Sequence, residues 1–414
     1  MTLSPGRIVG ISVGALAILG IGVYGPAMLL GPLPAVAVEP VASAAAPPAA
    51  VALPLPADGA SAVAVVDPEG ETTTIATGGS TEAVPIGGAA KLVTLLVTLD
   101  SLPLAVGAEG PAIKIGPEDF TDYLRYQSEE SRTLQVSPGE SWTQRDVVRA
   151  VLLASSNNHA DTLARWAFGS VDQYVAAANE WLAANGFATA HVADATGLSG
   201  DNVATAEELV RLAGLAVADP SLAAMLAGEA PVGVGARTVP DVIDHLADRG
   251  VRAITRSYTD QAALSFVFTR EIPVAEGGEA VRLVGAMTLI PDYETLDPAV
   301  GAIADTAVDA AQPVDVISAG AVYGRAHSAW GDEADLTAQA TRTSTGWQSA
   351  VGEAELDVDP FTTARGGSAV GRVTVPTPAG ELASPIELSA PIDDPGPLWR
   401  LTHPFPIIGE YLAG

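Results

Sequence analysis

The sequence predicts an α+β domain followed by a small all-β module, with a membrane-spanning helix at the N-terminus. Three observations carry this prediction. Strand-type runs near residue 60 and over residues 251–290 enclose a helical centre, which favours one sheet closed from distant segments. After about residue 311, short alternating runs are separated by Gly, Pro and Asp clusters, a pattern typical of β-structure. An uncharged apolar stretch over residues 8–30 is long enough to cross a bilayer.

The composition excludes several classes of function. The chain of 414 residues has a formal net charge of −29, which disfavours nucleic-acid phosphates as partners. Hydrophobic residues make up 48% of the chain, too many for a wholly disordered protein. With no cysteine, the chain has no disulfide, thiolate metal site or Cys nucleophile. The five histidines are scattered, so we expect neither a metal site nor a cofactor, and His159 is expected on a helix surface.

The N-terminal segment predicts where the protein resides. Residues 1–31 are interpreted as a cytoplasmic stub and a transmembrane anchor, because Arg7 precedes the apolar stretch and the acidic bulk of the chain follows it. The protein is then a single-pass protein of the cell membrane with its main domain outside the cytoplasm. A cleaved signal peptide is the alternative, since Ala35-Val36-Ala37 resembles a cleavage site. Residues 32–59, rich in Ala and Pro, predict a semi-rigid linker.

The main domain is expected over residues 60–305 and the β-rich module over residues 311–414. A hairpin is predicted at the start of the main domain, and a helix that is apolar on nearly every side, hence buried, follows over residues 87–99. The hairpin strands are expected at 61–66 and 71–77, further helices at 145–154, 159–168, 171–186 and 205–217, and three more strands at 251–258, 263–271 and 280–290.

Four segments of the main domain carry the motifs on which a functional interpretation depends. They are PIGGAAKLVTLLVTLD (85–100), LLASSNNHADTLARWAFGS (152–170), DATGLSGDNVATAEEL (194–209) and GVRAITRSYTDQAALSFVF (250–268). Their order resembles the D-alanyl-D-alanine carboxypeptidases, the low-molecular-weight penicillin-binding proteins that trim bacterial peptidoglycan. The resemblance covers about residues 60–300, and the C-terminal module looks like the small domain appended in that family. It implies a DD-peptidase/β-lactamase-like domain, in which an antiparallel sheet is flanked by helices.

The first motif of that family, S-x-x-K, is altered. The resemblance places Lys91 on the lysine and Gly88 on the nucleophilic serine. Residues three apart share one face of a helix, which is why a serine and a lysine base need this spacing. Glycine keeps its backbone N–H, so half of an oxyanion hole survives, but residue 88 has no hydroxyl with which to form an acyl-enzyme.

The second motif, S-x-N, is intact in Ser155 and Asn157. In the family the serine relays protons and the amide orients substrate and lysine, although these residues alone also fit a helix N-cap. In the third motif, K-T-G, the resemblance places Thr255, Arg256 and Ser257. Arg256 keeps a cation one residue out of register, so we expect its side chain on the opposite, solvated face of the sheet.

These residues support three hypotheses. In a serine hydrolase, loss of the nucleophile lowers turnover on the order of 10⁶-fold, so we favour a membrane-anchored pseudoenzyme. Its remnant catalytic residues are Lys91, Ser155 and Asn157, with substrate-binding positions at residues 255–257, and it binds peptidoglycan stem peptide or a cell-envelope protein. The alternative is an active serine-type D-Ala-D-Ala carboxypeptidase that uses Ser155 as a substitute nucleophile. The third hypothesis is a purely structural ectodomain without a ligand.

Overall fold

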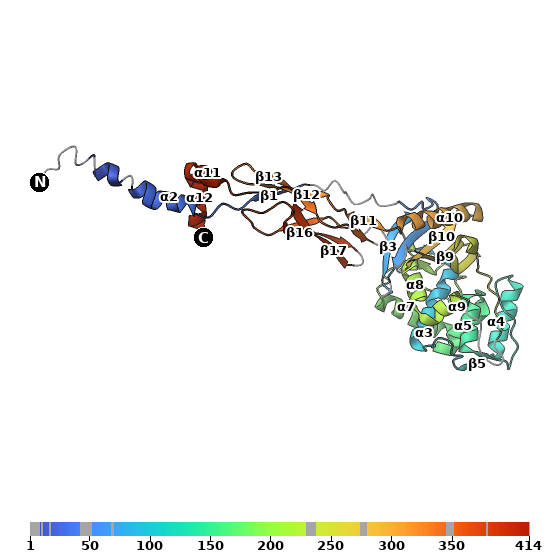
Figure 1. Ribbon diagram of the computed structural model, residues 1–414. Coiled ribbons are helices and arrows are strands. Elements are labelled where there is room, and N and C mark those ends of the chain that lie inside the picture. The colour runs from blue at the N-terminus through green and yellow to red at the C-terminus, as the bar shows by residue number, and fades with distance from the viewer. Residues whose placement is uncertain are drawn as a thin grey trace. The chain divides into compact units, whose positions relative to one another are not determined.

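The computed structural model describes residues 9, 11–15, 18–41, 52–67, 70–228, 237–273, 280–344, 352–377 and 380–413. Two compact units are distinguished (Figure 1). The large unit is Ala50–Gln312, and the small unit joins Met1–Ala49 to Pro313–Gly414. Arg7, residues 42–51 of the predicted linker and the centre of the predicted turn at residues 67–70 lie outside the described residues.

The large unit is built on a five-stranded antiparallel sheet of order β3-β2-β10-β9-β8. The pairing of β2 with β10 joins the two ends of the unit, with Val63 opposite Gly285, so the predicted closure of the sheet from distant segments is confirmed. The predicted hairpin is also confirmed, because β2 pairs with β3. The strands are β2 (Ala60–Val66), β3 (Thr72–Gly79), β8 (Arg252–Thr259), β9 (Ala263–Ile272) and β10 (Val281–Ile290).

Helices cover both faces of this sheet. Residues Leu283–Thr288 of β10 are all buried although successive side chains point to opposite faces. Helix α8 (Ala206–Ala218) packs on β2 and β10, and α10 (Tyr293–Ala310) packs on β9 and β10. The predicted buried helix is confirmed as α3, Ala90–Ser101, whose residues from Ala90 to Leu99 are all buried.

The remaining elements of the large unit form the helical part and its short connections. The predicted helices near residues 145, 159 and 171 are confirmed, whereas the helix at 117–128 was not predicted. That helix begins with Pro117 after Gly116, and its Asp119 carboxylate accepts the Gly116 N–H, a capping arrangement visible in the sequence. The elements are β4 (Val84–Pro85), η2 (Gly87–Ala89), β5 (Ala112–Lys114), α4 (Pro117–Ser128), β6 (Ser141–Thr143), α5 (Gln144–Leu152), α6 (Asn157–Phe168), α7 (Val171–Ala184), β7 (Val203–Ala204), α9 (Pro220–Leu226) and η3 (Ala247–Arg249).

The small unit contains a six-stranded sheet of order β1-β12-β13-β17-β16-β15 and the separate pair β11-β14. The prediction of a linker throughout residues 32–59 is wrong for Ala37–Pro40, which form β1 and pair with β12. The alternating pattern that identifies a half-buried strand is too short in this Ala- and Pro-rich stretch to be recognised. The strands are β11 (Val314–Ile317), β12 (Val322–His327), β13 (Glu333–Ala338), β14 (Arg342–Ser344), β15 (Glu355–Val358), β16 (Ala369–Thr377) and β17 (Gly380–Leu388).

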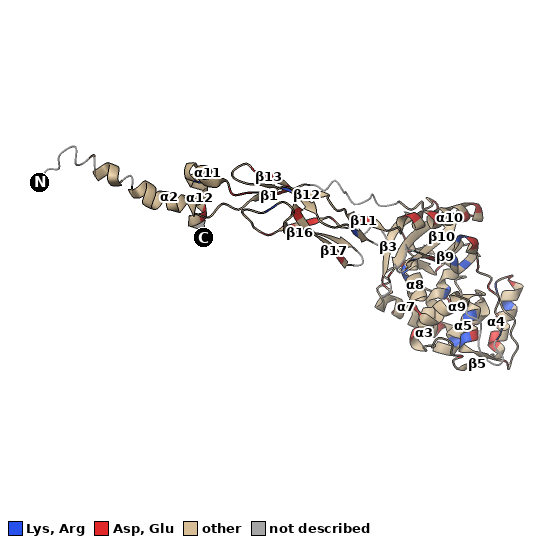
Figure 2. Ribbon diagram, in the orientation of Figure 1, with Lys and Arg blue, Asp and Glu red and all other residues tan. Residues whose placement is uncertain are grey.

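Helices from both ends of the chain meet in the small unit. Among the described residues, the N-terminal helical stretch Ile11–Leu29 has the length and apolar character of a membrane span, and it carries no charged residue (Figure 2). It includes η1 (Ile18–Tyr24) and α2 (Gly25–Leu29). Near the C-terminus, α11 (Gly396–Thr402) packs on α2 and is followed by α12 (Pro404–Ala413).

The C-terminal helices are only partly packed. Ile407 is fully buried, but Phe405 and Leu412 are 84% and 83% exposed. The Tyr24 hydroxyl donates to the Leu401 carbonyl at 2.7 Å, and Arg400 donates to the Gly31 carbonyl at 2.8 Å. These contacts fix α11 beside the end of the apolar helical stretch.

Candidate active site

A cleft of about 420 Å³ opens in the large unit. It brings together five of the predicted site residues from three separate segments: Gly88, Lys91, Ser155, Asn157 and Ser257. The other residues that line it are Glu129, Glu130, Ser131, Arg132, Thr196, Leu198, Tyr258, Thr259, Asp260 and Gln261. The sequence motifs, although spread over 170 residues of chain, therefore face one cavity in which a ligand could contact all of them.

Ser257 occupies the space beside Gly88. The Gly88 N–H donates a hydrogen bond to Ser257 Oγ at 2.9 Å. A β-carbon on residue 88 would lie 2.8 Å from both Cβ and Oγ of Ser257, closer than side-chain atoms tolerate. The N–H that would stabilise an oxyanion is thus already bonded, and the place of a side chain at position 88 is taken.

Lys91 is buried in the floor of the cleft. A β-carbon on Gly88 would be 3.9 Å from its Nζ, so the two positions keep the spatial relation that the motif implies. Nζ donates to the Thr196 carbonyl at 2.5 Å, and no carboxylate in the described part of the chain forms an ion pair with it. Burial lowers the pKa of Lys91 to about 8, against the opposing charge of Asp194. The ammonium therefore loses its proton more readily than an exposed lysine does.

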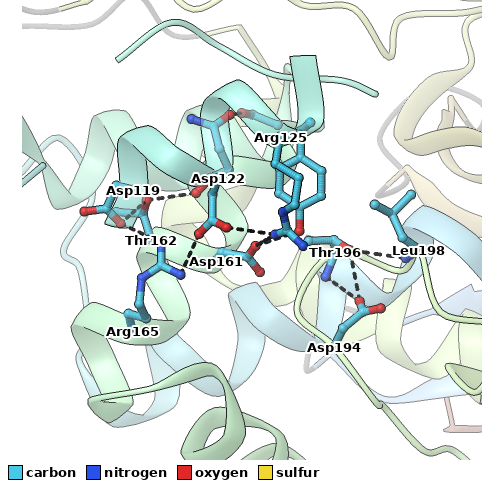
Figure 3. Close-up of polar contacts among 12 residues, drawn as sticks. Asp119, Asp122, Arg125, Asp161, Thr162, Arg165, Asp194, Thr196 and Leu198 are labelled. Atoms are coloured by element: carbon cyan, nitrogen blue, oxygen red, sulfur yellow. Dashed lines mark hydrogen bonds and ion pairs between the residues drawn. The ribbon is translucent and has the colours of Figure 1, made fainter. Parts of the chain in front are cut away.

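The Thr196 carbonyl is aimed at Lys91 by a loop built around Asp194. Oδ1 of Asp194 accepts the N–H groups of Thr196 and Gly197 at 2.7 and 2.6 Å, and Oδ2 accepts that of Ser199 at 2.7 Å. Figure 3 shows the Asp194 carboxylate turned into this loop, next to Thr196 and Leu198. Gly197 has φ +84° and packs on the carbonyl of Gly87, where no side chain fits.

The S-x-N segment forms the wall opposite strand β8. Ser155, only 4% exposed, has φ +49°, a left-handed conformation that is costly for a serine. Asn157 begins α6 and also lines the cleft. The strained backbone at Ser155 turns the chain between α5 and α6 and brings both residues to the cavity.

The residues at the K-T-G positions of β8 lie in different surroundings. Thr255 lines a crevice shared with Gly88, Lys91 and Ser155, and its buried Oγ1 has no hydrogen-bond partner among the described residues. Arg256 lies outside the cleft: its Nη2 donates to the Val242 carbonyl at 2.6 Å, and its Nη1 lies 3.3 Å from His245 Nδ1. The side chain is half-buried against these groups instead of solvated as expected, because the loop before η3 supplies both of them.

The interpretation of His159 as a helix-surface residue is wrong. His159 is fully buried, its ring lies 4.3 Å from that of Trp142, and its Nδ1 is 2.8 Å from Ser156 Oγ. Because Ser156 donates its own proton to Asn158 at 2.8 Å, His159 Nδ1 is the donor to Ser156. Nε2 is then a buried acceptor with no hydrogen-bond partner among the described residues, and burial lowers the pKa of His159 to about 3.

A charged network connects α4 to α6 (Figure 3). Arg165 pairs with Asp119 and with Asp122, both at 2.7 Å. Arg125 lies 3.3 Å from Asp161, which also accepts the Tyr126 hydroxyl at 2.7 Å. Burial raises the pKa of Asp161 to about 6, against the hydrogen bond from that hydroxyl. This network holds α4, whose end leads into the Glu129–Arg132 wall of the cleft.

Sequence reasoning missed Arg132. It stands in no recognisable motif, and only its position after the charged helix α4 and before the S-x-N segment distinguishes it. In the structure it lines the cleft, and its Nη1 donates to the Arg256 carbonyl at 2.6 Å.

Comparison with known proteins agrees with this geometry. Residues 52–226 match the model of the D-alanyl-D-alanine carboxypeptidase family. This matched segment of the large unit belongs to the D-alanyl-D-alanine carboxypeptidase family. A D-alanyl-D-alanine carboxypeptidase from Mycobacterium tuberculosis H37Rv is similar in structure, with a TM-score of 0.52 and 27% identity, covering 64% of this chain and 95% of that one. The DD-peptidase-like fold predicted from the motifs is confirmed.

Two further relatives define the extent of the likeness. A D-alanyl-D-alanine endopeptidase from Pseudomonas aeruginosa is 33% identical over 130 residues, which are 31% of this chain and 38% of that protein. The chain thus matches about two fifths of the length of this curated relative. Penicillin-binding protein 6B of Escherichia coli shares the fold, with a TM-score of 0.57 and 14% identity over 82% of this chain and 97% of that one.

Proposed function

We propose that this chain is a membrane-anchored carboxypeptidase-family pseudoenzyme that binds peptidoglycan stem peptide without forming an acyl-enzyme. One observation carries the proposal: residue 88 has no side chain, and its N–H is bonded to Ser257 Oγ. A covalent route needs a hydroxyl beside Lys91 and a free N–H to receive the oxyanion. The open cleft that remains, lined by Lys91, Ser155 and Asn157, supports binding of the family's peptide ligand.

The proposal is tested by intact-mass spectrometry of the full chain in detergent after incubation with a penicillin, together with an assay for released D-alanine. An active family carboxypeptidase serves as the positive control. We expect neither a mass shift nor D-alanine release. A penicillin adduct, on whatever residue, would show that the chain is an enzyme.

If the chain is an enzyme, Ser155 is the residue that would act as the nucleophile. It lines the same cleft as Lys91, and its strained backbone holds its side chain toward the cavity. An adduct that maps to Ser155 and disappears in Ser155→Ala would establish the alternative of a relocated nucleophile. If the cleft variants Lys91→Ala and Asn157→Ala had no effect on peptide binding or on cells, a purely structural ectodomain would be favoured.

Membrane attachment through a retained N-terminal helix is the second part of the proposal. The apolar stretch Ile11–Leu29 supports it, as does the exposed apolar surface formed beside it by Leu398, Phe405 and Leu412. Cleavage after Ala37 would remove the buried Val36 and the first residue of β1, which disfavours a cleaved signal peptide. With an N-terminus in the cytoplasm, the large unit and the part of the small unit that follows the membrane span lie outside.

Protease treatment of intact and of lysed cells tests this topology. We expect the full-length chain in the membrane fraction and digestion of the bulk of the chain from outside. A soluble product that begins near residue 38 would contradict the retained anchor.

A further inference from the structure

The guanidinium of Arg132 is a cation of the cleft that no acidic residue neutralises. Within the described part of the chain, no Asp or Glu forms an ion pair with it, and its side chain bonds only to the Arg256 carbonyl, at 2.6 Å from Nη1. That bond uses one of its five N–H groups. Arg132 is half-buried and lines the cleft, so a ligand in the cavity lies beside a cation with unused donors.

The loop that carries Arg132 is anchored to the S-x-N segment. The Arg132 carbonyl accepts the N–H of Asn157 at 2.9 Å. Two residues further on, the N–H and the carbonyl of Leu134 bond to the Asn158 side chain at 3.2 and 3.1 Å. The backbone is therefore fixed at Arg132 and two residues after it, and the guanidinium is held against β8 at Arg256, the residue between Thr255 and Ser257. A donor group held in advance loses little entropy when a ligand binds.

The charges around the cleft favour a ligand with a single carboxylate. Burial and the charge of Arg256 lower the pKa of Arg132, and the charge of Arg132 in turn lowers that of Lys91. An anion bound between Arg132 and Lys91 offsets the cost of burying the two cations and weakens the repulsion between them. Glu129, Glu130 and Asp260 also line the cleft and are exposed, so they repel an extended polyanion. The planar fork of an arginine matches the two oxygens of a carboxylate.

We propose that Arg132 is the carboxylate-binding residue of the cleft and holds the C-terminal carboxylate of the bound peptide. This inference rests on the proposed function, since it names the part of the stem peptide that the cleft recognises. Arg132 reaches β8 from the loop before α6. The strand's own arginine, Arg256, is directed away from the cleft. Arg132 makes no contact with a bond to be broken, and its assigned role is recognition.

The test is calorimetric titration of the full chain in detergent with diacetyl-L-lysyl-D-alanyl-D-alanine and, separately, with its C-terminal amide. We expect the wild type to bind the acid at least about tenfold more tightly than the amide. Arg132→Gln should abolish this preference by weakening the acid alone. Arg132→Lys should restore part of it, because a charge without the fork remains. Arg249→Gln is the matched control: it removes an arginine that pairs with Asp305 and does not line the cleft, and it should leave the preference unchanged.

Each other result overturns a defined part of the argument. If Arg132→Gln and Arg132→Lys both retain the wild-type preference, the assignment of Arg132 fails while the proposed function stands. If inorganic phosphate displaces the acid at equal concentration, the site is not selective for a carboxylate. If the wild type binds neither peptide, both proposals fail. A penicillin adduct combined with an Arg132-dependent preference refutes only the proposed function. Thermal unfolding of each variant establishes that it is folded.

Discussion

The backbone N–H of Gly88 and the hydroxyl of Ser257, 169 residues apart, form a hydrogen bond of 2.9 Å in the centre of the cleft. Ser257 stands in the same space as any side chain on residue 88 would. Residue 88 has no side chain, and the side chain of Ser257 fills the space that one would need. Substitutions at two residues in such contact are not independent, and their effects are not additive.

This spatial relation gives the first prediction. Gly88→Ser alone should destabilise the fold by about 1–3 kcal/mol, because its Cβ overlaps Ser257, and should form no penicillin adduct. Gly88→Ser combined with Ser257→Gly removes the overlap, frees the N–H and places a hydroxyl near Lys91. The double variant should recover stability and show an adduct by intact mass.

Ser257→Gly alone is the control and should remain without an adduct. Acylation of the Gly88→Ser single variant as rapid as that of the double variant would contradict a blocking role for Ser257.

The position of Ser257 shows where sequence reasoning about the site ends. The resemblance to the family's motifs pointed to Gly88, Lys91, Ser155 and Asn157, because each motif is a short segment that can be recognised locally in the sequence. The contact between residues 88 and 257 depends on how β8 lies against η2, which no local pattern specifies. Arg132 was missed for the same reason, since its role follows from hydrogen bonds between two loops and not from its neighbours in sequence.

Lys91→Met should leave the unfolding free energy at pH 7 unchanged or higher. The folded-state pKa, about 8, is below the ordinary 10.5, so the fold disfavours the ammonium. Between pH 8 and 10.5 the unfolded chain binds the extra proton, and wild-type stability therefore rises with pH over this interval. The methionine variant lacks this rise, and urea unfolding at pH 7, 8 and 9 measures the difference.

The control is Lys114→Met, since Lys114 is the only other lysine and is exposed on β5. Its effect should stay within about 0.5 kcal/mol. A loss above about 2 kcal/mol in Lys91→Met at pH 7 would instead assign Lys91 a structural role.

His159 should make the large unit sensitive to acid. Its folded-state pKa, about 3, is below the ordinary 6.5, so between these values the unfolded chain binds a proton that the folded chain does not. Stability then falls as the pH falls from 6.5, by up to about 1.4 kcal/mol per pH unit from this group. His159→Leu should flatten that part of the profile of unfolding free energy against pH. His191→Gln, which replaces an exposed histidine, should leave that part of the profile unchanged.

The fold was more predictable than the site because its strongest elements are set by local patterns. Apolar residues on every side identified α3, and dense β-branched runs identified β8, β9 and β10. The short strand β1 could not be recognised, because its alternation is brief and its stability comes from pairing with β12, almost 290 residues away in sequence. The burial of His159 likewise depends on Trp142, which reaches it from a different element.

The Asp194 loop provides the last prediction. Asp194→Asn directs an amide NH₂ at an N–H that the carboxylate now accepts, so at least one of the bonds to Thr196, Gly197 and Ser199 is lost. The unfolding free energy should drop by about 2–3 kcal/mol. Removal of the negative charge should also lower the pKa of Lys91 further below 8, because that charge opposes the effect of burial. The rise of stability with pH should then begin at a lower pH than in the wild type.

Asp201→Asn, at an exposed carboxylate of the same loop, controls for the loss of charge. It should leave the unfolding free energy and the pKa of Lys91 near their wild-type values. An Asp194→Asn protein as stable as the wild type would show that the loop is held by its packing on Gly87 and not by this carboxylate.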